Sequence, residues 1–124
     1  MKTEGEFRVI IAGGRDFSDY ELLKRKVLFY TNEVNKDNLI IIISGKAKGA
    51  DSLGEKLAKE IGWKVLEYPA DWDTNGKSAG YIRNIEMAKN ADALIGFWDG
   101  RSRGTKHMID TAKKNGLLVR VVNY

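Results

Sequence analysis

The feature that most constrains the fold is a regular alternation of short apolar runs with amphipathic helical stretches. The segment 39–43 (LIIII) has no polar alternation, which is typical of a central parallel strand covered on both faces. We expect strands at 7–12, 39–43, 64–68, 93–98 and 117–122, and helices at 20–34, 51–61, 80–88 and 105–114. Strands that alternate with helices imply βαβ crossovers. The pattern therefore predicts an α/β fold, a three-layer Rossmann-like sandwich with a parallel sheet of about five strands flanked by helices.

Length and composition exclude several kinds of site. The chain has 124 residues, no Cys and one His, so disulfides, thiolate zinc sites, cysteine nucleophiles and two-histidine metal motifs are excluded, and we expect no metal site. We expect residues 1–124 to form a single domain. The longest apolar run is too short to span a bilayer, so we expect a cytoplasmic protein without membrane contact. A net charge of +4 permits binding to phosphates or nucleic acid without requiring it.

Glycines and charged residues gather in the loops that follow the strands. These loops are GGRDF (13–17), SGKAKGAD (44–51), PADWDTNGK (69–77) and DGRSRGT (99–105). The carboxyl ends of parallel strands meet at one edge of the sheet, where ligands of such folds bind. The four loops therefore predict a ligand site.

Two of these loops lead from a strand into a helix and suit an anion. In SGKAKGAD, backbone N–H groups at the positive end of a helix could hold a phosphate, with Lys46 and Lys48 adding charge. The loop matches neither a Walker A motif nor GxGxxG, and a tight turn that needs Gly45 and Gly49 only for its geometry is the alternative. In DGRSRGT, Gly104 and Thr105 open the helix, and the loop arginines, Arg101 and Arg103, could bind an oxyanion in bidentate fashion or lie solvated on the surface.

The other two loops leave more alternatives. Asp16 could orient Arg15, bind a ribose hydroxyl or cap the next helix, for which Ser18 and Asp19 are the other candidate caps. Asp71 could accept a hydrogen bond from a ligand hydroxyl while Trp72 stacks on a base. Alternatively, the tryptophan closes the core beside a capping aspartate.

Two side chains on the helices stand close to the expected site. Arg83 follows the third loop, at a spacing from Glu86 that allows a pair. His107 lies in the first turn of the last expected helix, and a lone exposed histidine in such a place is more often inert than a participant.

These motifs, together with GKSAGYIRNIEM and the stretch 91–105, resemble the YspA/YpsA-like branch of the SLOG superfamily, whose members occur in bacteria and phages. The resemblance spans residues 7 to about 112. It implies a domain that senses or processes nucleotides, nucleotide sugars or ADP-ribose-like molecules, and a homo-oligomer that pairs through helices flanking the site. The residues to which the family's ligand motif carries are Gly13, Gly14, Arg15, Asp16, Ser44, Gly45, Gly49, Asp51, Asp71, Trp72, Lys77, Arg83, Asn84, Gly100, Gly104 and Thr105. Because of their positive charge, we add three further candidate ligand-binding residues, Lys48, Arg101 and Arg103.

The chain differs at three positions from the members of the superfamily that it resembles. LOG phosphoribohydrolases of the same superfamily resemble RKxxM followed by PGGxGTxxE, in which the glutamate is catalytic. The corresponding segments here place Asn84 at the lysine and Met108 at the glutamate. N-glycosidic cleavage needs a carboxylate, and the sequence does not select among Asp51, Asp71 and Glu86. Lys46 stands where relatives show a small residue, so it could crowd the loop or add a cation.

The leading hypothesis is the binding of a nucleotide or nucleotide-derived ligand, such as a nucleotide sugar, an ADP-ribose-like molecule or a signalling nucleotide. Its phosphate would lie on the entrances to the helices at 51 and 105, and a divalent cation could accompany it. Its base or sugar would meet Arg15, Asp71 and Trp72. One alternative is a nucleotide hydrolase of the phosphoribohydrolase type. A second is a single-strand DNA binder, since SGKAKGAD is similar to the SGxAxGxD segment of DNA-processing protein A.

Overall fold

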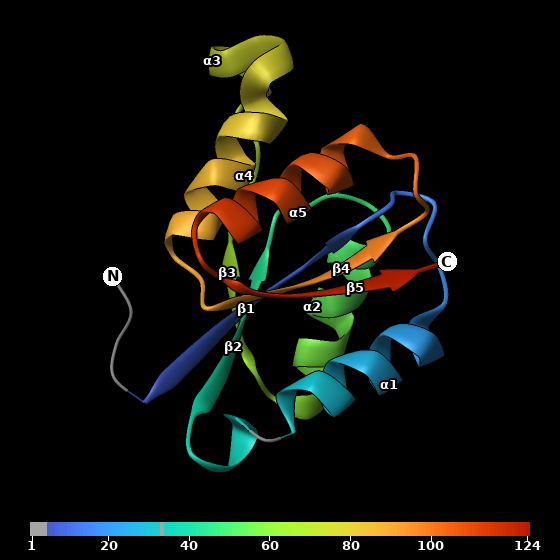
Figure 1. Ribbon diagram of the computed structural model, residues 1–124, viewed down its shortest axis with the longest axis vertical. Helices are drawn as coiled ribbons and strands as arrows, with labels where there is room; N and C mark the ends of the chain where they lie inside the picture. Colours follow the sequence, from blue (N-terminus) through green and yellow to red (C-terminus); the bar gives the residue numbers. More distant parts are fainter. Residues whose placement is uncertain (1–4, 33) are drawn as a thin grey trace.

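A single parallel sheet forms the middle layer of the protein. The computed structural model describes residues 5–32 and 34–124. The strand order is β3-β2-β1-β4-β5, and the neighbouring strands pair in parallel (Figure 1). The strands are β1 (Glu6–Gly13), β2 (Leu39–Ser44), β3 (Lys64–Glu67), β4 (Ala93–Trp98) and β5 (Leu118–Asn123).

Helices cover both faces of this sheet. They are α1 (Tyr20–Thr31), α2 (Ala50–Ile61), α3 (Trp72–Asn75), α4 (Ala79–Lys89) and α5 (Arg103–Lys114), with 3-10 turns η1 (Val34–Lys36) and η2 (Gly76–Ser78). In Figure 1, α1 and α2 lie on one side of the sheet, α4 and α5 on the other, and α3 projects beyond the body of the molecule. The predicted three-layer Rossmann-like sandwich is confirmed. Among the described residues, no helix is long and apolar enough to cross a membrane.

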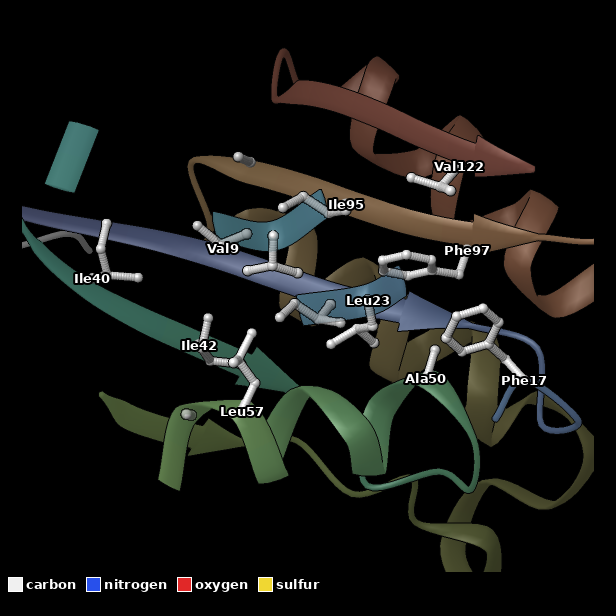
Figure 2. Close-up of a cluster of buried hydrophobic side chains, with 14 residues drawn as sticks. Val9, Phe17, Leu23, Ile40, Ile42, Ala50, Leu57, Ile95, Phe97 and Val122 are labelled. Carbon is white, nitrogen blue, oxygen red and sulfur yellow. The ribbon is translucent and has the colours of Figure 1, made fainter. Parts of the chain in front are cut away.

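The central strands are buried on both faces, which explains why their sequences lack polar alternation. In β1, Val9 and Ile11 face the core beneath α1 and α2, while Ile10 faces the core beneath α4 and α5. Figure 2 shows the first core, in which Leu23 of α1 and Leu57 of α2 pack against the strands. Since successive strand residues point to opposite faces, a strand between two helical layers must be apolar at every position.

The structure departs from the expected elements after α1 and after β3. Helix α1 ends at Thr31, although we expected it to reach residue 34; residue 33 lies outside the described residues. Val34 still packs on the first core, but from the turn η1, so its apolar character did not mark a continuing helix. The segment 69–77 is expected to be a loop, but it contains α3 and the start of η2. Asp71 starts α3 by accepting a hydrogen bond from the Thr74 N–H (3.1 Å). A single helical turn is too short to produce an apolar period.

The N-terminus of α2 rests directly on the loop that follows β1. The Ala50 N–H donates to the Gly14 carbonyl oxygen at 3.3 Å. Gly49 has φ +79°, and a Cβ atom there would lie 2.1 Å from that same oxygen. Only glycine permits both this backbone angle and this approach. The predicted structural role of Gly49 is thereby accounted for, and two of the four loops are joined.

Replacing Gly49 should therefore lower the free energy of unfolding by more than the strain of its positive φ alone would. Gly49→Ala adds a steric clash to the positive-φ strain and should lower the free energy of unfolding by roughly 3 kcal/mol or more. Gly116→Ala is the matched control, since Gly116 has φ +75° and open space around its Cβ position. It should cost only about 1–2 kcal/mol. Urea unfolding of both variants measures the difference, and equal losses would contradict the clash.

Candidate functional site

A cleft of about 520 Å³ opens at the carboxyl ends of β1 and β4. These strands are neighbours, with Gly13 opposite Phe97. The chain leaves β1 toward β2 and β3 on one side, and later returns to β4 and β5 on the other. The loops after β1 and β4 therefore diverge, which leaves the crevice where open parallel sheets bind ligands.

The cleft collects part of the predicted site. Its walls contain eleven of the candidates: Gly13, Gly14, Arg15, Asp16, Asp51, Trp72, Lys77, Arg83, Asn84, Gly104 and Thr105. The candidates outside its lining are Ser44, Gly45, Lys48, Gly49, Asp71, Gly100, Arg101 and Arg103.

The candidates outside the lining divide into supporting and exposed residues. Ser44 donates to the Glu55 carboxylate (2.5 Å), and Gly49 provides the close approach to Gly14. Lys48, Arg101 and Arg103 are exposed.

Arg83 is a half-buried cation fixed at one wall of the cleft. Its guanidinium donates to the Gly45 carbonyl oxygen, and its Nε donates to Asn84 Oδ1 at 3.0 Å. Arg83 therefore does not make the pair with Glu86 that the spacing allowed, and Glu86 is exposed on the outer side of α4. Gly45 permits this contact, because a Cβ atom there would lie 2.6 Å from Arg83 Nη1.

Arg15 supplies a second positive charge in the same cleft. Burial lowers the pKa of Arg83; the nearby Asp51 carboxylate opposes this shift, and the positive charge of Arg15 adds to it. Two guanidinium groups are thus close enough to repel each other. An anion between them would relieve that repulsion.

Asp51 is the carboxylate beneath Arg83. Its side chain is buried and accepts a hydrogen bond from the Ala47 N–H at 3.4 Å. Burial raises the pKa of Asp51 to about 6, although Arg83 and the backbone N–H groups of Ala47 and Gly45 oppose the shift. Of the three carboxylates that the sequence left open, Asp51 alone lines the cleft. Asp71 caps α3, and Glu86 is exposed.

Asp16 holds the loop after β1 to the end of β5. The Tyr124 hydroxyl donates to Asp16 Oδ1 at 2.7 Å, and the Tyr124 ring packs edge-on against Phe17 with 4.8 Å between centroids. Burial and the Asp16 carboxylate raise the pKa of Tyr124. Asp16 does not cap α1; Asp19 does, by accepting from the Leu22 N–H at 3.0 Å. Sequence reasoning missed Tyr124 because its partner is distant along the chain.

The entrance to α5 is built differently from the expectation. The helix begins at Arg103, not at residue 105, because Ser102 caps it by accepting from the Thr105 N–H (3.4 Å). His107 consequently lies in the second turn. Asp99 Oδ1 accepts from the N–H groups of Ser102 and Arg101 (both 2.8 Å), and these bonds lower the pKa of Asp99.

The structure distinguishes the alternatives that the sequence left open at Trp72 and Lys46. Trp72 is 52% exposed and lines the cleft, so it does not close the core. Lys46 has φ +62°, and its Nζ pairs with Glu55 (2.9 Å) and Glu67 (3.2 Å). Those contacts raise the pKa of Lys46 and hold it outside the cleft lining, so it adds no cation there.

Sequence reasoning did not propose several lining residues, which are Ala12, Ala47, Gly80, Tyr81, Met87, Asp99, Ser102 and Met108. Asp99 had a usable signal, because it directly follows a strand in one of the four loops. Met108 also had one, because it stands where LOG enzymes carry their glutamate. Tyr81 and Met87 had no such signal, since they look like ordinary residues of a helix face. In the described parts of the chain, no three His, Asp or Glu side chains are grouped as a metal would require.

The buried carboxylate makes stability depend on pH in a specific direction. Since the pKa of Asp51 is near 6 in the folded protein and ordinarily 3.8, the folded state binds its proton more tightly. Its contribution to the free energy of unfolding should therefore fall as pH rises from about 4 to about 6, by roughly 2–3 kcal/mol, and then stay level.

Comparison with Asp51→Asn tests this dependence. Subtracting the variant's unfolding free energy from that of the unaltered protein at each pH should isolate the falling segment. Asp71→Asn removes an exposed carboxylate outside the cleft and is the control. A difference profile that is flat for Asp51→Asn would contradict the assignment.

The chain is similar to a known family and to a phage protein. The model of the YspA, cpYpsA-related SLOG family matches residues 7–74, which include the loops after β1 and β2. The Gene 61 protein of Mycobacterium phage D29 is 34% identical over 119 residues, which cover 90% of this chain and 93% of the relative.

Two solved structures share the fold. DNA processing protein A (DprA) from Streptococcus pneumoniae has a TM-score of 0.74 at 18% identity; the match covers 96% of this chain and 50% of that one. The protein TM1055 has a TM-score of 0.65 at 19% identity, and the match covers 92% of this chain and 72% of that one. This chain thus spans half the length of the DprA chain. The loops that build the cleft lie within the matched family segment or the phage match, and the chain belongs to the YspA, cpYpsA-related SLOG family.

Proposed function

We propose that this protein binds a nucleotide or a nucleotide-derived ligand in the cleft between β1 and β4. The observation that carries the proposal is the pair of guanidinium groups, Arg15 and Arg83, on a cleft at the switch point of the sheet. A volume of about 520 Å³ is in the range of small-molecule and cofactor sites. Membership of the SLOG family supports a nucleotide-related ligand.

The charged side chains of the cleft suit two kinds of ligand group. Arg15, Arg83 and Lys77 suit phosphate oxygens, whereas Asp16 and Asp99 suit the hydroxyls of a ribose. The half-exposed ring of Trp72 offers a stacking surface for a base. This assignment moves the phosphate away from the entrance to α5, where Asp99 would repel it. It also removes Asp71 from the ligand, because that side chain caps α3.

Hydrolysis of a nucleotide N-glycosidic bond is the second candidate function, and Asp51 is the observation that favours it. Met108 is buried and lines the cleft at the position where LOG enzymes carry their glutamate, and a thioether transfers no proton. Asp51, with a pKa of about 6, would have to serve as the acid or base. It is held by backbone N–H groups and Arg83, which suits a positioning role better, so binding is preferred.

Two arginines that the sequence analysis both assigned to the ligand site provide a sharp test of it. Arg15→Gln should weaken nucleotide binding by about tenfold or more, because it removes a charge-assisted contact. Arg101→Gln should change affinity less than about twofold, since Arg101 lies outside the cleft. A thermal-shift screen of mono-, di- and cyclic nucleotides, NAD and ADP-ribose, with and without Mg²⁺, followed by calorimetry, measures both.

The same preparation separates the rival functions. Absence of stabilisation by every compound, or equal losses in the two variants, would contradict the proposed site. Release of free adenine from AMP, lost in Asp51→Asn, would favour the hydrolase. Binding of a single-stranded oligonucleotide that weakens steeply with salt would favour the DNA-binding alternative.

We further propose that the protein forms a homo-oligomer through α4. Ile82 and Ile85 are 44% and 40% exposed on one side of this helix. If they form the contact, Ile82→Lys together with Ile85→Lys should lower the mass measured by light scattering to that of one chain, 13.9 kDa. Phe29→Lys, at a residue 72% exposed on α1, is the control and should leave the mass unchanged. A cytoplasmic location stays a prediction.

A further inference from the structure

Asn84 links the arginine in the cleft to the chain's single histidine. Its side chain is 6% exposed and lies between α4 and α5. Asn84 Oδ1 accepts from Arg83 Nε at 3.0 Å, while Nδ2 lies 3.2 Å from His107 Nδ1 and 3.4 Å from the Gly104 carbonyl oxygen.

The chemistry of these groups allows one arrangement of protons. A guanidinium group only donates, so Asn84 must present its oxygen to Arg83 and its NH₂ group to His107. His107 Nδ1 must then be an unprotonated acceptor. The imidazole proton therefore sits on Nε2, which is 3.5 Å from the Thr111 hydroxyl.

The surroundings of His107 hold the ring in this state. It stacks on Tyr81, with centroids 4.1 Å apart and planes 18° apart. Burial lowers the pKa of His107, and the Asp110 carboxylate on the same helix, which pairs with Lys106 at 2.7 Å, opposes the shift. From α4, the groups that face the imidazole are the Tyr81 ring and, through Asn84, the Arg83 guanidinium.

We propose that His107 is a positioning residue that acts through Asn84 to hold Arg83 against the anionic group of the ligand, and that protonation of His107 releases Arg83. An imidazolium would direct an Nδ1–H at the Asn84 NH₂ group, so two donors would oppose each other. Rotation of the amide would relieve this conflict but would turn the NH₂ group toward Arg83 Nε. Arg83 would then keep only its bond to Gly45.

The direction of the effect distinguishes this relay from simple electrostatics. An added positive charge near the cleft would by itself strengthen anion binding as pH falls. Loss of the Arg83 anchor predicts the opposite. The proposal rests on the nucleotide-binding function, because Arg83 must contact the ligand for affinity to report on it.

The first experiment needs no ligand. Nitrogen-15 NMR of the free protein should show the Nε2–H tautomer at about pH 8, and the signals are unambiguous because the chain has one histidine. The Arg83 Nε–H signal should shift with the same midpoint as the imidazole in a titration to about pH 5. In His107→Asn the part of the shift that follows the imidazole should be absent. An Arg83 signal that ignores the titration of His107 would overturn the relay.

The second experiment measures ADP-ribose affinity by calorimetry, since its pyrophosphate keeps a constant charge over this range. The unaltered protein should bind about three- to tenfold more weakly at about pH 5.5 than at about pH 7.5, the effect of one hydrogen bond. His107→Phe keeps the ring contact with Tyr81 but offers no acceptor, and it should bind weakly at both pH values. His107→Asn offers Oδ1 in place of Nδ1 and should restore the affinity with less pH dependence. Asp51 is present in both variants, so its titration is common to them.

The outcomes separate the two proposals. If ADP-ribose binds but His107→Phe has the affinity and pH profile of the unaltered protein, the relay is wrong and nucleotide binding stands. Normal binding by Arg83→Gln would also overturn the relay. If no nucleotide binds, the proposed function fails and the NMR titration alone decides whether His107 controls Arg83. Thermal midpoints of the variants show whether each is folded.

Discussion

The structure depends on the burial of β1 along both edges and both faces. β2 and β4 pair with its edges, and the helical layers of α1 with α2 and of α4 with α5 cover its faces. Only the end of such a strand reaches solvent, because neighbouring strands and helices cover the rest of its backbone, so the loop that follows it lies between the layers. The end of β1 is therefore where the two halves of the chain separate and where the cleft forms.

The chemistry of the cleft follows from how few of its charges are free to move. Gly45 and Asn84 hold Arg83, backbone N–H groups hold Asp51 and Asp99, and Tyr124 holds Asp16. Groups fixed in this way lose little conformational entropy when a ligand arrives. This preorganisation is consistent with the proposed binding of a molecule that carries both phosphates and hydroxyls.

Much of the fold could be predicted from the sequence. For the site, the sequence predicted which loops take part but not which of their residues line the cleft. The LIIII segment predicted the central strand because burial on both faces leaves a local signature. The four loops were located correctly because strand ends in a parallel sheet share one edge. Apart from the family resemblance, the sequence did not distinguish Arg15, which lines the cleft, from Arg101, which does not, because both are loop arginines after a strand. Asp51 and Asp71 were equally indistinguishable until burial separated them.

The sequence by itself determined the order of strands and helices, the parallel sheet and the edge at which the four loops meet, because apolar periodicity and glycine placement are local properties. Only the tertiary structure decided which side chains share the cleft. Arg83 meets Gly45, Asn84 meets His107 and Tyr124 meets Asp16 across separations of 38, 23 and 108 residues. Such contacts depend on how helices pack across the sheet, and no period within a single segment encodes that packing.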